Sequence, residues 1–133
     1  MPSIPDSHTD LLDSPFATLA TVGPDGRPQM STVWFLAEGG RVRFSLHTDR
    51  QKTKNLQANP AIGVHILDAA NPMRYLEVRG DATIEPDPEY DFADRVGAKY
   101  GGVDLRAMDA GRGSRVVVTV DATRVNAVDL SAG

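Results

Sequence analysis

The sequence predicts a mostly β protein, an antiparallel barrel accompanied by short helices. Six or seven segments have the composition of strands, and turn-forming residues join them in order as hairpins. The helical segments between them are short. The alternation of strands with long helices that marks a doubly wound sheet is missing, as are the motifs GxGxxG and GxxxxGK[ST]. These observations exclude a Rossmann or P-loop protein.

Length and composition limit the classes of protein further. A chain of 133 residues has the size of one domain, so we treat residues 1–133 as a single domain. The absence of cysteine excludes disulfides and thiolate metal sites and fits a reducing cytoplasm, where we expect the protein to reside. We find no signal peptide and no membrane-spanning stretch. A net charge of −4 argues against nucleic acid as a partner.

The first half of the chain begins with a short helix at residues 7–13, whose Ser-x-x-Asp start resembles a capping box. A hairpin follows, with arms at 16–22 and 29–37 around a run of turn formers. Residues 41–47 alternate strictly, which predicts a strand with one buried and one polar face. The buried face carries Val42, Phe44 and Leu46, and the polar face carries Arg41, Arg43, Ser45 and His47.

The second half alternates short helices with longer strands. We expect a helix at residues 49–60, with Asp49 as its N-cap and Pro60 as its stop. Glycine is common at bulges, so Gly80 predicts a β-bulge within the expected strand at residues 73–85. Prolines and acids open a further helix that ends at a glycine pair, and residues 103–114 form a mobile loop. The remaining expected elements are strands at 61–67 and 73–85, a helix at 86–102, and one or two strands within 115–130.

Positive charge is concentrated in one part of this acidic chain. Asp49 is the only acid between residues 39 and 67, which we call the cationic segment. Five of the 14 lysines and arginines lie there: Arg41, Arg43, Arg50, Lys52 and Lys54. The N-terminus of a helix attracts anions, and nearby cations strengthen the attraction. The segment is therefore either a seat for a phosphate or a solvated helix face.

Histidines provide little evidence for side-chain catalysis. His8 is expected to be solvated, and His65 to be packed in the core or at an interface. His47, on the polar face beside Ser45, is the best candidate for a ligand contact. No HExxH or GxSxG motif occurs. We identify no catalytic residue, so an enzyme with this sequence needs a cofactor for its chemistry.

Several motifs resemble those of a known family. They are Lys52, Lys54-Asn55-Leu56, Asn59-Pro60 and the stretch Arg74 to Gly80, RYLEVRG. Their order resembles the flavin and deazaflavin oxidoreductases, which share the FMN-binding split β-barrel of pyridoxamine 5'-phosphate oxidase. The resemblance covers about Phe16 to Val128. It implies a split barrel and a homodimer that buries the cofactor ring between its subunits.

The resemblance also implies roles for residues. Arg50 and Lys52 take the place of the pair that grips the cofactor phosphate, with Lys54 and Asn55 nearby. Oxidase members carry adjacent Arg-Lys here and a Gln at the position of Tyr75. These departures make the chain more similar to the branch that uses the deazaflavin coenzyme F420 than to an FMN-dependent oxidase.

Three further candidates remain open between two interpretations. Trp34 either belongs to the core or an interface, or shields one face of the cofactor ring. Tyr75 and Arg79 share a strand face that is either exposed to solvent or placed beside the cofactor. The full set of expected cofactor-binding residues is Arg50, Lys52, Lys54, Asn55, Ser45, His47, Trp34, Tyr75 and Arg79.

The sequence thus predicts a homodimeric oxidoreductase, a reductase that transfers a hydride between F420 and a small, flat or conjugated electrophile. Two alternatives remain. One is an FMN-dependent reductase or oxidase with the same fold, and the other is a non-catalytic protein that carries F420 or a flavin. All three require the same phosphate seat and ring slot, and the sequence does not identify the substrate.

Overall fold

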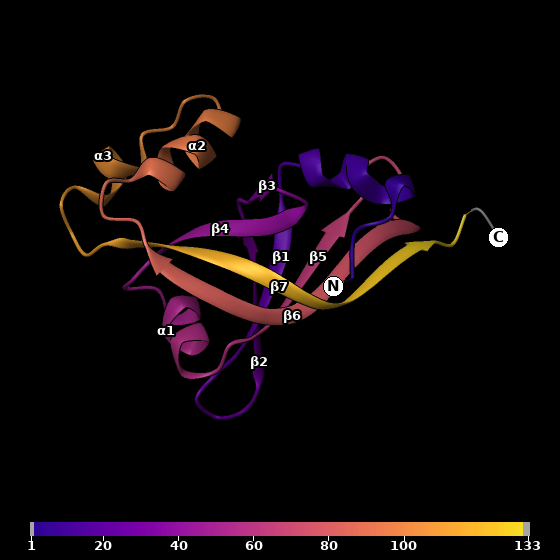
Figure 1. The fold of residues 1–133 in the computed structure, drawn as a ribbon, viewed down its shortest axis with the longest axis horizontal. Helices are drawn as coiled ribbons and strands as arrows, with labels where there is room; N and C mark the ends of the chain where they lie inside the picture. The colour runs from indigo at the N-terminus through magenta and orange to yellow at the C-terminus, as the bar shows by residue number, and fades with distance from the viewer. Residues whose placement is uncertain (1, 132–133) are drawn as a thin grey trace.

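The computed structural model describes residues 2–131. Its main feature is a seven-stranded antiparallel sheet with the strand order β2-β1-β5-β6-β7-β4-β3 (Figure 1). The mostly β fold with short helices is therefore confirmed. In chain order the elements are the 3-10 helix η1 (Asp6–Asp13), β1 (Ala17–Val22), β2 (Pro28–Val33), β3 (Leu36–Glu38), β4 (Arg41–His47), α1 (Gln51–Ala58), β5 (Ala61–Leu67), β6 (Arg74–Pro86), α2 (Asp91–Lys99), α3 (Leu105–Asp109) and β7 (Arg115–Asp129).

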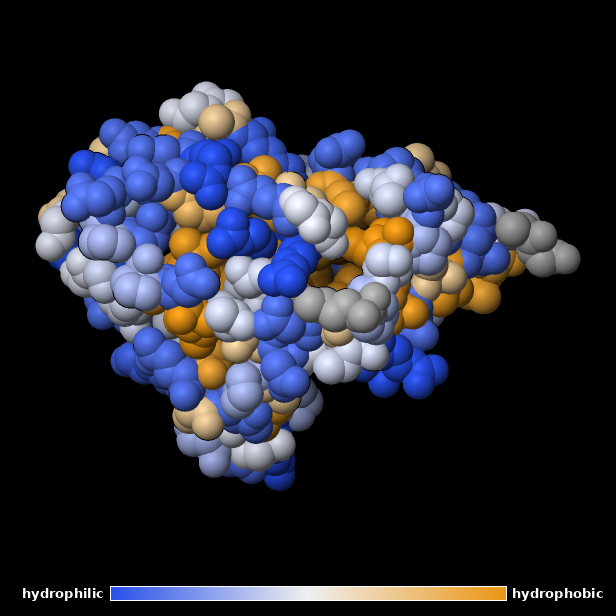
Figure 2. Space-filling model, in the orientation of Figure 1, coloured by the Kyte–Doolittle hydropathy of each residue, from blue (hydrophilic) through white to orange (hydrophobic). Residues whose placement is uncertain are grey.

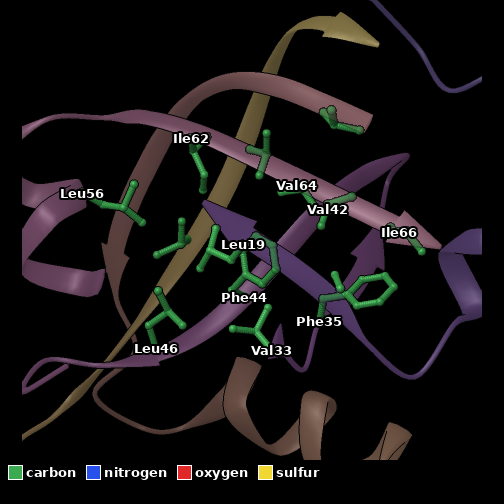
Figure 3. Packing of buried hydrophobic residues seen from close by; sticks show 14 of the residues in the cluster. Leu19, Val33, Phe35, Val42, Phe44, Leu46, Leu56, Ile62, Val64 and Ile66 are labelled. Carbon is green, nitrogen blue, oxygen red and sulfur yellow. The ribbon is translucent and has the colours of Figure 1, made fainter. Parts of the chain in front are cut away.

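The sheet curls so that its two ends share one core. Strands β1 and β4 are separated by three other strands, yet Leu19 and Phe44 belong to the same buried cluster. Figure 3 shows these two side chains and Val64 of β5 directed into the same interior. The alternation predicted for residues 41–47 is confirmed, because Val42, Phe44 and Leu46 are buried while the residues between them are not.

Strands β6 and β7 are the longest and bend together. Their register shifts between Arg79 and Gly80, where a β-bulge lies as the sequence predicted. A Cβ atom at Gly80 would lie 2.1 Å from the backbone oxygen of Asp121. The close approach of the two backbones therefore requires glycine. Residues 115–129 form one continuous strand that pairs with both β6 and β4.

Three predictions in the first half of the chain were wrong. The expected strand at 29–37 is interrupted at Trp34 and Phe35, and its last part is β3, which pairs with β4. The N-cap of α1 is Arg50, one residue after the predicted Asp49, and its side chain makes no capping hydrogen bond. His8 was expected to be solvated but is buried, with its Nε2 atom 3.0 Å from the backbone oxygen of Val128.

The second half also departs from the prediction. The helix expected at 86–102 is shorter, because Pro86 still belongs to β6 and the buried carboxylate of Asp87 accepts hydrogen bonds from the backbone N–H groups of Phe92 and Ala93. Asp87 thereby satisfies two N–H groups in the first turn of α2. The expected loop at 103–114 contains α3. Its N-cap Asp104 accepts a hydrogen bond from the N–H group of Ala107.

Helices α2 and α3 cover one end of the sheet through a second apolar cluster formed by Phe92, Ala93, Val96 and Leu105 with Val117 of β7. Figure 2 shows that the outer surface at this end is largely hydrophilic. Among residues 2–131, no helix is long and apolar enough to cross a membrane.

Candidate functional site

A pocket of about 520 Å³ opens between the start of α1, the end of β4 and the α2–α3 pair. In Figure 1, α1 lies on one side of β4, and α2 and α3 lie on the other. The pocket is lined by Thr32, Val33, Trp34, Ser45, Leu46, His47, Asp49, Arg50, Lys52, Val96, Leu105, Met108, Asp109, Arg112 and Arg115. Its wall combines apolar side chains with a cluster of charged groups, as expected for a ligand site.

Two cations dominate the α1 side of the pocket. Arg50 is the N-cap of α1, and Lys52 lies in its first turn. The ion pairs of residues 2–131 include neither side chain. Partial burial lowers the pKa of the Lys52 ammonium, and the neighbouring Arg50 lowers it further. An anion between these groups would neutralise a charge that the fold leaves unneutralised.

The backbone of α1 adds to this attraction. The N–H groups of Thr53 and Lys54 donate to the backbone oxygen of Arg50, and the Thr53 hydroxyl donates to the backbone oxygen of His47 at 2.7 Å. No side chain caps the helix. The N–H groups of Gln51 and Lys52 in the first turn are therefore available to an anion, which would fill the role of a capping Ser or Asp.

Trp34 forms part of another wall. Its ring stacks on Tyr100, the residue that follows α2, with 4.3 Å between ring centroids and an interplanar angle of 6°. The position of Trp34 in the pocket agrees with the interpretation that it shields a ligand. Its inclusion in the second apolar cluster agrees with the core interpretation as well.

Ser45 lines the pocket beside an ion pair that the sequence did not predict. Arg115 of β7 binds both oxygens of Asp109 in α3, at 2.7 and 2.9 Å, and it also donates to the backbone oxygen of Ser45 at 3.3 Å. Arg115, and after it the hydroxyl of Tyr90, holds the pKa of Asp109 below its usual value. Because Asp109 neutralises Arg115, Arg50 and Lys52 remain the stronger attraction for an anion.

His47 is fully engaged with the backbone. Its Nδ1 atom accepts from the N–H group of Asp49 at 3.1 Å, so Nε2 carries the proton and donates to the backbone oxygen of Arg112 at 2.7 Å. A Cβ atom at Gly113 would lie 2.4 Å from the ring. The imidazole therefore holds residues 112–113 against the pocket, and neither ring nitrogen is free to contact a ligand there.

The other four predicted residues do not line this pocket. Lys54 is exposed on α1, while Asn55 is buried and donates to Thr21 and Gln29 at 3.1 and 2.9 Å. Tyr75 stacks on His65, and Arg79 pairs with a glutamate, both on the outer face of β6. The structure thus brings together Trp34, Ser45, His47, Arg50 and Lys52.

The sequence prediction expected substrate contacts from residues 103–114 but assigned no site residue to the α2–α3 region, whose Val96, Leu105, Met108 and Arg112 line the pocket. The spacing of Phe92, Ala93 and Val96 is a helical signal that could have placed the inner face of α2. Nothing in the sequence placed Met108 or Arg112 opposite α1.

The curled antiparallel sheet, with the pocket at one end and few short helices around it, has the architecture of a split β-barrel. Residues 4–129 match the family described as pyridoxamine 5'-phosphate oxidase, and the chain belongs to that family. This match spans nearly all of the described residues and confirms the predicted fold.

Solved structures agree. One described as an F420 reductase is 39% identical to this chain, with a TM-score of 0.81 over 92% of this chain and 98% of that one. A conserved hypothetical protein from Mycobacterium tuberculosis is 26% identical, with a TM-score of 0.78 over 95% and 85% of the two chains. A heme binding protein from Mycobacterium smegmatis, 20% identical, has a TM-score of 0.69 over 96% of this chain and 55% of that one, and shows that the fold is shared.

Proposed function

We propose that this protein is an oxidoreductase that binds coenzyme F420 and uses it to reduce a small, flat or conjugated electrophile. The observation that carries the proposal is the pair of unneutralised cations, Arg50 and Lys52, at the uncapped start of α1. The 39% identity to a structure described as an F420 reductase supports this choice of cofactor.

The residues of the pocket fit a phosphate-bearing ring compound. Arg50, Lys52 and the N–H groups at the start of α1 would hold the phosphate through charge-assisted hydrogen bonds. Trp34, Leu46, Val96 and Leu105 offer apolar surface for a planar ring. The same features fit FMN, which makes an FMN-dependent enzyme the second candidate, and a non-catalytic carrier of either cofactor would need no more.

A bound deazaflavin supplies the hydride. The chain would bind the phosphate, orient the ring against Trp34 and exclude water with α3. No acid–base pair is needed for hydride transfer itself. Residues that contact the substrate would come from the α2–α3 side, where Met108 and Arg112 line the pocket.

We further propose that two copies of the chain form the functional unit. The outer face of the sheet presents Phe16 and Leu67, which are 55% and 45% exposed, around a second hollow of about 270 Å³ that also contains His65. Exposed apolar surface of this kind marks interaction sites. Burial against a second copy would also enclose Tyr75 and Arg79, two of the four predicted residues that lie outside the pocket.

The decisive experiment is a titration of the purified protein with F420 and with FMN, followed by absorbance and by equilibrium dialysis. We expect saturable binding of both, tighter for F420. Turnover of reduced F420 with a panel of conjugated carbonyl and quinone acceptors then separates an enzyme from a carrier. Saturable FMN binding without affinity for F420 would reverse the choice of cofactor.

A further inference from the structure

The end of α2 is attached to the interruption between β2 and β3. Phe35 is fully buried but lies outside both strands, so no neighbouring strand satisfies its backbone polar groups. The hydroxyl of Tyr100 accepts a hydrogen bond from the Phe35 N–H group at 3.0 Å and donates to the backbone oxygen of Pro15 at 2.7 Å. The side chain of Tyr100, the residue that follows α2, thus replaces a strand partner.

Lys99 completes this attachment. Its ammonium donates to the backbone oxygens of Phe35 and Ser14 at 2.9 and 2.8 Å and lies 3.7 Å from the centre of the Phe35 ring. Both hydrogen-bond acceptors are uncharged, and burial lowers the pKa of Lys99. An ammonium ion that is partly buried among uncharged acceptors loses hydration, so this arrangement lowers the stability of the fold.

The residue between the end of β2 and Phe35 is Trp34, the chain's only tryptophan and part of the pocket wall. Tyr100 therefore acts on Trp34 in two ways: its hydroxyl fixes the following backbone unit, and its ring stacks on the indole. We propose that Tyr100 is a positioning residue that holds the Trp34 ring in place as a wall of the cofactor pocket.

The consequence for ligand binding rests on the proposed function. A tryptophan face presented in a fixed orientation binds a planar ring more tightly than one that must be ordered on binding, because the ordering cost has already been met in the free protein. A stacked aromatic pair of this kind contributes enough to change affinity by about 3- to 10-fold when it is lost.

The test compares Tyr100→Leu, which removes the stack and the hydroxyl, with Tyr100→Phe, which keeps the stack. The fluorescence of Trp34 reports directly on its surroundings. For Tyr100→Leu we expect an altered emission maximum, stronger quenching by acrylamide, and a dissociation constant for F420 raised about 3- to 10-fold. For Tyr100→Phe, which keeps the stack but loses the hydroxyl bound to the Phe35 N–H group, we expect changes in the same direction that are smaller than those of Tyr100→Leu.

Ile66→Val serves as the control. Ile66 is fully buried in β5 and does not line the pocket, so this change lowers stability without touching the wall. It should leave the emission of Trp34 and the affinity for F420 unchanged. Parent-like emission, quenching and affinity in Tyr100→Leu would overturn the proposal.

Two further measurements keep the proposal open to refutation. If Tyr100→Leu does not fold, time-resolved anisotropy of Trp34 in the parent protein decides, because rapid local reorientation of the indole would show that nothing holds it. If the parent binds neither F420 nor FMN, the proposed function fails. The fluorescence comparison still tests the role of Tyr100 in that case.

Discussion

At the scale of single residues, Lys52 provides the sharpest test of the phosphate seat. Lys52→Ala should remove one charge-assisted hydrogen bond, worth roughly 1.5–3 kcal/mol, and so weaken F420 binding by about 10- to 150-fold. Isothermal titration calorimetry measures this change directly. The fold should be retained, because Lys52 joins no ion pair among the described residues and its partial burial disfavours its charge.

Arg27→Ala is the matched control, since Arg27 lies exposed in the turn between β1 and β2, away from the pocket. Lys99 also lies outside the cationic segment, but it is unsuitable as a control, because its ammonium donates hydrogen bonds to the backbone oxygens of Phe35 and Ser14. Arg50→Ala should behave like Lys52→Ala, and the double variant should lose less than the sum if both bind one phosphate. Parent-like affinity in both single variants would identify the cluster as a solvated helix face.

The pKa of Lys52 also predicts how binding depends on pH. In the free protein this pKa is lowered, by burial first and by Arg50 second. A bound phosphate would raise it again, so binding takes up a proton wherever free Lys52 is deprotonated. The association constant should fall as pH rises through the lowered pKa, below the usual 10.5 of lysine. Lys52→Arg should remove this decline, and a decline that persists in Lys52→Arg would exclude Lys52 as its source.

The stability of the ligand-free protein should depend on pH in the opposite direction to the association constant. A lysine whose pKa is lower in the folded than in the unfolded state destabilises the fold while it is charged. The free energy of unfolding should therefore rise as pH increases through the folded pKa toward the unfolded one.

Individual roles could be predicted only where the signal is local. Arg50 and Lys52 were found because their charges stand together in an otherwise acidic chain. The role of Asn55 could not be found in this way, because its partners Thr21 and Gln29 come from a distant hairpin. Arg115 likewise gains its partner Asp109 only through the path of α3.

At the scale of elements, the hydrophobic periodicity and the turn-forming residues predicted most strands but not their interruptions. Residues 29–37 have uniform strand composition, yet β2 ends at Val33 because Tyr100 and Lys99 take over the backbone groups of Phe35. The start of α2 was misplaced because Asp87 satisfies its first turn from outside the helix. Both are tertiary contacts that no local pattern contains.

The bulge in β6 gives a testable prediction at this scale. Gly80→Ala would place a Cβ atom 2.1 Å from the backbone oxygen of Asp121, so β7 would have to move. We expect a loss of about 3 kcal/mol in the free energy of unfolding, measured by urea denaturation. In Gly63→Ala the new Cβ atom would meet Ala20 at 3.6 Å, an ordinary contact, and stability should stay equal or rise by up to about 1 kcal/mol. Equal stability of the two variants would show that the bulge does not depend on glycine.

At the scale of the whole molecule, the fold class could be predicted because most strands have their own hydrophobic signal and their own turns. The pocket could be predicted only in part, since one side is a contiguous charged stretch and the other comes from α2 and α3. Those helices reach the pocket by packing Phe92, Val96 and Leu105 against Val117, a contact between segments far apart in the chain.

Assembly is the last property to test. Phe16 and Leu67 leave apolar area exposed beside a hollow on the outer face of the sheet, and a second copy of the chain would bury it. Light scattering coupled to gel filtration should give about twice the 14.3 kDa of the chain. Leu67→Glu would bury a charge in this contact, which is costly without a partner, so its mass should shift toward that of one chain.

Ala98→Glu adds the same charge on the exposed face of α2, outside this hollow, and should remain dimeric. If the cofactor ring is enclosed between subunits, Leu67→Glu should also bind F420 more weakly, although its substitution lies outside the pocket. A parent protein that is monomeric at saturating F420 would refute the shared site. If Leu67→Glu is monomeric but binds F420 with full affinity, the parent protein is still a dimer. The whole binding site then lies within one chain.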